Sequence, residues 1–171
     1  CAVLQMVQGK SFIAGSVRVQ RPFLDILVNK DKNDEQRTSS YQMPNEMLAS
    51  IKEHVNIGNL RLSNVGLKYG ERFAVRAKPA LITLDSVDAT VEGIDNRSNK
   101  RGAINIHAEG RFMKSGAMNI SMSIVTVRPE FSLSYSGTLG RMNLRALNGF
   151  LETAERVRVS GDIQSATFDV S

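Results

Sequence analysis

The stretch from residue 103 to residue 112, AINIHAEGRF, alternates between apolar and polar residues along almost its whole length. Ile104 and Ile106 fall on one side of an extended chain, and Asn105 and His107 fall on the other. A side-chain period of two is typical of a β-strand with one apolar and one solvated face. We therefore predict a half-buried strand over this stretch.

The same alternation recurs in neighbouring segments along the chain. Comparable runs are SVRVQ (16–20), FLDILV (23–28), NLRLSN (59–64), VGLKYG (65–70), ITLDSVDATVEGI (82–94), AMNISMSIV (117–125), EFSLSYSGTLG (130–140) and RVRVSGDIQSATFDV (156–170). The apolar positions change from even to odd numbers near Asn64, which indicates a bulge or a tight bend. Successive strands joined by short Gly, Asn or Ser turns favour an antiparallel meander.

Two segments carry helix signals instead. Pro44 suits the first turn of a helix, and Asn143 suits an N-cap. The apolar stripe of the first helix would comprise Met47, Leu48, Ile51 and Val55, and that of the second Leu144, Leu147 and Leu151. Both helices are expected to be short.

Two short helices cannot cover one face of so many strands. The sheet must then fold into a sandwich, close into a barrel, or stay curved and open around an apolar guest. We predict a mainly β protein with a curved antiparallel meander sheet, an open groove or half-barrel, and two short α-helices. A hydrophobic content of 42% supports a folded core, and the chain has no apolar run of about 18 residues that would span a membrane. Residues 1–171 are expected to form a single β-rich domain.

Signals for catalysis, metal binding and nucleic-acid binding are weak. The chain has two histidines, of which His107 lies on the polar side of a strand and His54 near the end of the first predicted helix. Asp31, Asn33 and Glu35 have the spacing of a calcium loop, but glutamines occupy the positions where that loop needs Gly and Glu. The net charge of +5 is scattered, and the absence of Trp with only 3 Tyr argues against a base-stacking sheet. We expect no enzyme activity, no metal, no cofactor and no nucleic acid.

The C-terminal third, YSGTLGRMNLRALNGFLETAERVRVSGDIQSATFDV, resembles the closing segment of the AsmA-like bacterial envelope proteins, a family related to TamB and to bridge-like lipid carriers. The residues that carry the likeness are Gly137, Leu139, Met142, Leu147, Asn148, Leu151, Val157, Val159, Gly161 and Phe168. Upstream, GSVRVQRPFLDI and MPNEMLASIKEHVNIGNLRLSNVGLKYGERF are similar to the family's strand with a Pro–hydrophobe pair and to its helix followed by two strands.

The resemblance implies a long, strongly bent sheet with an apolar inner face. It also implies a segment of a longer periplasmic protein that is anchored in the inner membrane and serves outer-membrane upkeep or phospholipid passage. The expected partners are then a phospholipid or another apolar ligand, the membrane through an anchor absent from these residues, and neighbouring segments of the same chain.

The apolar faces have two interpretations. They can form a plain closed core, as in a structural or interaction β-sandwich of an envelope assembly, or they can line a channel for an apolar ligand. We predict the lipid groove, with methionines that adapt to varied acyl chains. Its predicted lining comprises Ile104, Ile106, Phe112, Met118, Ile120, Met122, Phe131, Leu133 and Tyr135.

Overall fold

The computed structural model describes residues 5–7, 11–30, 51–74, 76–97, 102–125 and 132–171. The strands are β1 (Gln5–Val7), β2 (Ser11–Gln20), β3 (Phe23–Asn29), β4 (His54–Arg72), β5 (Ala80–Asp95), β6 (Ala103–Phe112), β7 (Gly116–Val125), β8 (Ser132–Leu139), β9 (Met142–Asn143), β10 (Asp162–Ile163) and β11 (Ala166–Val170). A 3₁₀ turn, η2 (Leu144–Leu147), leads into helix α2 (Asn148–Ala154).

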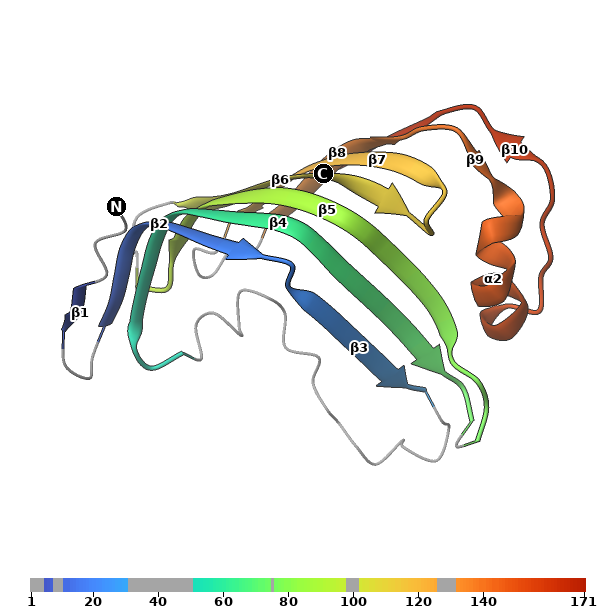
Figure 1. The fold of residues 1–171 in the computed structure, drawn as a ribbon, viewed down its shortest axis with the longest axis horizontal. Coiled ribbons are helices and arrows are strands. Elements are labelled where there is room, and N and C mark those ends of the chain that lie inside the picture. The colour runs from blue at the N-terminus through green and yellow to red at the C-terminus, as the bar shows by residue number, and fades with distance from the viewer. Residues whose placement is uncertain (1–4, 8–10, 31–50, 75, 98–101, 126–131) are drawn as a thin grey trace.

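Nine of these strands form one sheet, bent into an arch (Figure 1). Its order is β1-β2-β4-β5-β6-β7-β8-β11, and β3 continues alongside β4 where β2 ends. Strands β9 and β10 form a separate pair. The sheet is not closed, which confirms the mainly β, open form of the predicted fold and excludes a closed sandwich for the described residues.

One part of the meander is not antiparallel. Strands β2 and β3 both run parallel to β4, with Val17 opposite Leu60 and Leu24 opposite Leu67. The predicted antiparallel meander therefore describes the sheet from β4 to β8, with β11 beside β8, and does not extend to the pairing of β2 and β3 with β4. A parallel neighbour requires a long connection that returns to the same end of the sheet, and residues 30–53 supply that length.

The first predicted helix falls mostly on residues outside the described ones, and its last part is wrong. Residues 51–53 are not helical, and His54 and Val55 already belong to β4. The Asn96 side chain holds this segment extended, because its Nδ2 donates to the carbonyls of Ile51 (3.0 Å) and Glu53 (2.7 Å). The Val55 N–H donates back to Asn96 Oδ1 at 2.8 Å. These tertiary contacts override a helical stripe that is only local.

A crease crosses the arch where the chain takes left-handed backbone at three neighbouring places, namely between β2 and β3, within β4 and within β5. Arg21, Asn64 and Ser86 have φ values of 53°, 53° and 51°. Asn64 and Ser86 are each an added residue in their strand, and the two bulges compensate, so that β4 and β5 return to the same register beyond them. The parity change near Asn64 thus marks a bulge, as predicted, and bulges sharpen local twist and bending.

The second predicted helix is present and sits at one end of the concave side (Figure 1). The side chain of Asn143 caps the 3₁₀ turn by accepting a hydrogen bond from the Arg145 N–H at 2.9 Å. The following helix α2 packs against β5. Nearby, Met142 is 2% exposed and lies beside Gly116, where an added Cβ would come within 2.8 Å of the Leu139 side chain and 3.2 Å of Met142.

Candidate functional site

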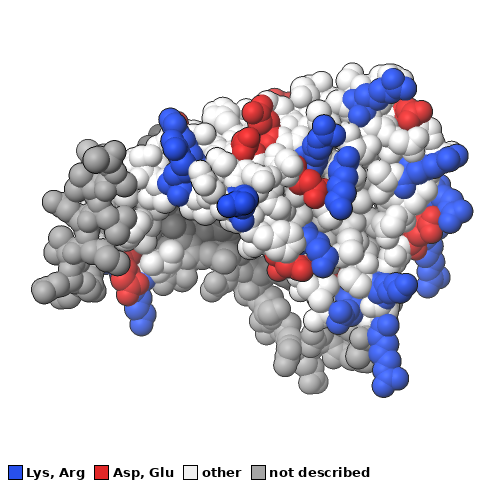
Figure 2. Space-filling view, viewed as in Figure 1, with Lys and Arg blue, Asp and Glu red and all other residues white. Residues whose placement is uncertain are grey.

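The two faces of the sheet differ sharply in chemistry. Along β6, the polar residues Asn105, His107, Glu109 and Arg111 are exposed, and the residues between them are half-buried. Charged side chains are scattered over the outer side of the arch in Figure 2, while α2 lies on the concave side (Figure 1). The apolar residues therefore line the concave side, which we call the apolar face.

Cross-strand registers arrange the apolar face in rows. One row runs through directly opposed residues of six strands: Leu60, Val91, Ile106, Met122, Tyr135 and Val170. The next row comprises Leu62, Ala89, Ala108, Ile120, Gly137 and Phe168. Opposed side chains of this kind are close enough to touch, so each row is a continuous apolar band.

The second row is shallow at its middle because Ala89, Ala108 and Gly137 carry little or no side chain. The Phe168 ring lies over Gly137, where an added Cβ would come within 2.6 Å of the ring. The same ring is 6.2 Å, between centroids, from Tyr135 in the neighbouring row. Small residues thus lie among large ones along this row, and Tyr135 and Phe168 form an aromatic pair at β8 and β11.

Eight of the nine predicted lining residues lie on this face. The registers Ile104–Ile124–Leu133 and Ile106–Met122–Tyr135 place five of them, and Ile120, Met118 and Phe112 follow in adjacent positions. Phe131 lies outside the described residues. Met118 is buried, while Ile120 and Met122 are only partly covered. Whether any of them contacts a lipid stays a prediction.

The prediction missed the parts of the apolar face on β4, β5 and β11. Leu60, Val91 and Phe168 belong to the same rows as the predicted residues. These residues also alternate with polar ones in the sequence, so the predicted lining could have included them. What the sequence did not provide was the register that joins distant strands into rows.

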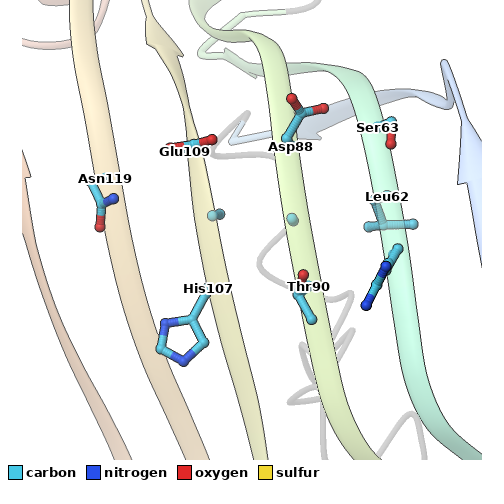
Figure 3. Close-up of a pocket in the computed structure, with 10 residues that line it drawn as sticks. Leu62, Ser63, Asp88, Thr90, His107, Glu109 and Asn119 are labelled. Carbon is cyan, nitrogen blue, oxygen red and sulfur yellow. The ribbon is translucent and has the colours of Figure 1, made fainter.

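The convex side carries a polar depression of about 320 Å³. Figure 3 shows Asp88, Thr90, His107, Glu109 and Asn119 around it, on strands β5 to β7. Asp88 Oδ1 accepts the Asn64 N–H at 2.8 Å, and His107 Nδ1 lies 3.0 Å from Ser121 Oγ. Across the described part of the chain, no three His, Cys, Asp or Glu residues are grouped as metal ligands. The depression is lined by solvated polar side chains, and one of them, His107, is in hydrogen-bond contact with the Ser121 hydroxyl.

Of the two histidines, one lies where the sequence predicted it and the other does not. His107 is on the polar side of its strand, as expected. His54 does not end a helix but lies in β4, with its Nε2 3.2 Å from Asp95 Oδ1. The Arg97 backbone N–H, and after it the His54 contact, lowers the pKa of Asp95. His54 therefore belongs to the hydrogen-bonded start of β4.

A buried carboxylate lies at the far end of β4. Glu71 is 9% exposed, and its Oε1 accepts hydrogen bonds from Lys30 Nζ (2.8 Å) and from the Tyr69 hydroxyl (2.7 Å). These two contacts, with that of Lys30 the stronger, lower the pKa of Glu71. The group is a satisfied ion pair, which explains how a charge can be buried in a thin sheet.

Among the described helices, none has the length and apolar character to cross a bilayer. Comparisons with protein-family models, curated proteins and solved structures found no match for this chain. Its function must therefore be argued from the apolar face and from the charges around it.

Proposed function

We propose that this chain is a non-enzymatic segment of a cell-envelope protein whose apolar face shelters phospholipid acyl chains. The proposal includes the setting that the sequence resemblance implies, a periplasmic position in a longer protein anchored in the inner membrane. The observation that carries it is a multi-strand apolar face that no second layer of described elements covers, apart from α2 at one end.

The exposed surface of the chain supports this proposal. Its accessible area is 12417 Å², whereas a compact monomer of this mass, 18.8 kDa, exposes about 8,300 Å². A sheet one layer thick leaves apolar side chains accessible that a sandwich would bury. An accessible apolar face is typical of a binding surface.

The mechanism follows from solvation alone. Each methylene group that leaves water for the apolar face gains about 0.8 kcal/mol. Because neighbouring rows of Leu, Val, Ile and Met offer similar surroundings, an acyl chain can slide between them with little change in free energy. The polar head group stays in water at the open edge of the sheet, so no chemical step is needed.

Bound lipid is the direct test. Purified protein is extracted gently with organic solvent, and lipids are identified and quantified by mass spectrometry. We expect phospholipid with the native chain and its loss in Ile120→Asp, since a carboxylate in the middle of the apolar face is poorly solvated there.

Ser121→Asp is the matched control, because Ser121 neighbours Ile120 in β7 but lies on the opposite face beside His107. It should retain bound lipid. Native protein free of lipid, or equal lipid in both variants, would contradict the proposal.

A structural or interaction module is the second candidate, and the sheet edges favour it. Strand β3 pairs with β4 alone and β11 with β8 alone among the described strands. Unpaired edges can accept a further strand from a neighbouring segment. This function predicts a filled interface in the assembled protein and no lipid in extracts of the purified chain.

A further inference from the structure

Cations gather where β4 turns into β5, at the end of the sheet that also carries the end of β3 (Figure 1). Lys30, Arg72, Arg76 and Lys78 lie there, and we call these four residues the basic tip. A hydrogen bond of 3.0 Å from the Ala77 N–H to the Ala74 carbonyl tightens the connection. Lys and Arg side chains are conspicuous at this end in Figure 2.

The charges of the basic tip are only partly neutralised. Lys30 pairs with Glu71, but Arg76 and Lys78 are exposed and have no ion-pair partner among the described residues. Elsewhere several cations do have acidic neighbours, as in Lys68–Asp25 (3.1 Å). Counting the described residues alone, the basic tip is therefore a local excess of positive charge and not merely a share of the scattered total.

Strand β3 places exposed apolar side chains beside the basic tip. Phe23, Leu24, Ile26 and Leu27 are 68%, 51%, 39% and 44% exposed. The strand is an edge of the sheet and runs toward the tip (Figure 1). Exposed apolar residues next to unpaired cations match a surface that is anionic outside and apolar beneath, which is the surface of an anionic bilayer.

We propose that the basic tip and β3 dock this protein on an anionic lipid bilayer. The inference deepens the proposed function, since the apolar face continues along β4 and β5 to Tyr69 and Ile82, close to the tip. Acyl chains could then pass between the bilayer and that face. The docking itself depends only on the residues of the tip and of β3.

Vesicle co-sedimentation tests the docking. The protein is titrated with vesicles of phosphatidylcholine and with vesicles in which phosphatidylglycerol replaces part of it. We expect binding only to the anionic vesicles, and binding should weaken with added salt. Each cation near such a membrane contributes about fivefold in affinity, so Arg76→Gln/Lys78→Gln should bind about 30-fold more weakly.

Arg18→Gln/Arg61→Gln is the matched control. It removes the same net charge from two exposed arginines that are opposite each other on β2 and β4, away from the tip. We expect it to bind nearly as well as the native chain. An equal loss in both double variants, or equal binding to both kinds of vesicle, would overturn the proposal.

Two further measurements separate docking from its alternatives. Ile120→Asp should bind vesicles normally even where it no longer retains lipid, so the docking and the groove can fail independently. Light scattering measures the molar mass in solution and so tests the alternative that a second copy of this chain covers β3. A dimer that Phe23→Ser/Leu27→Ser dissociates, without vesicle binding by the native chain, would also overturn the proposal.

Discussion

The Asn64 N–H donates a hydrogen bond of 2.8 Å to the Oδ1 atom of Asp88 across the crease. Asn64 is the bulged residue of β4, so the bulge takes its N–H out of the regular ladder. The Asp88 carboxylate replaces the missing backbone acceptor. A side chain on one strand thus stabilises the bend of the next.

Asp88→Ala should therefore destabilise the protein by about 1 kcal/mol, because an exposed bulge loses its only acceptor. Urea unfolding followed by circular dichroism measures the change. Asp88→Asn keeps an oxygen at this position and should lose less. Glu109→Ala is the control: Glu109 lies directly opposite Asp88, and removing a like charge should leave stability unchanged or slightly raised.

Gly137→Ala should lower the thermal midpoint. Its Cβ would collide with the Phe168 ring and with the Asn119 carbonyl, and overpacking of this kind costs about 1–3 kcal/mol. Gly149→Ala, in α2, meets nothing within 4 Å and should raise the midpoint, since alanine favours the helix. A Gly137→Ala variant as stable as the native chain would contradict the position assigned to Phe168.

Ala108→Trp tests whether the apolar face is open at its small residues. Ala108 lies between Ala89 and Ile120 in its row, so an indole there should lie over the face with little loss of stability if nothing covers it. The expected result is weaker fluorescence of a dye that binds apolar surfaces. Ala117→Trp, on the exposed convex side of β7, should leave dye binding unchanged. Unfolding of Ala108→Trp would contradict an open face at this position.

Glu71 should contribute to acid sensitivity. Its pKa is lower in the folded protein than in the unfolded chain, so its contribution to stability is present at neutral pH and is lost as the pH falls through the folded pKa. The loss is confined to pH values below the ordinary pKa of glutamate, about 4.3. Glu71→Gln should cost about 1–2 kcal/mol at pH 7 and reduce the difference in stability between neutral and acidic pH. Unfolding midpoints over a pH series check both effects, and an unchanged acid sensitivity would contradict them.

Local patterns predicted much of this fold. The alternation along β6 and β7 gave both strands and the face of each side chain, and the parity change at Asn64 gave the bulge. The cap at Asn143 is local as well, because its partner is two residues away. Each of these features depends on a few consecutive residues.

Long-range features could not be obtained in this way. The parallel pairing of β2 with β4 joins residues 43 positions apart in the sequence, such as Ser11 and His54, which no local alternation encodes. The apolar stripe through Ile51 and Val55 suggested a helix. The contact that prevents this helix comes from the Asn96 side chain, which is 41 positions from Val55 in the sequence. For the same reason, the rows of the apolar face became evident only from the registers between strands.

The paired bulges make the curvature of this protein a property of two added residues. Asn64 and Ser86 offset each other, so a chain lacking both would keep every side chain on its present face and keep β4 in step with β5. Its strands, however, would run straight through the crease. Deleting both residues together could thus convert the arch into a flatter sheet with the same side chains on each face. Paired insertions of this kind would let a sheet change its curvature without a change in the residues that line it.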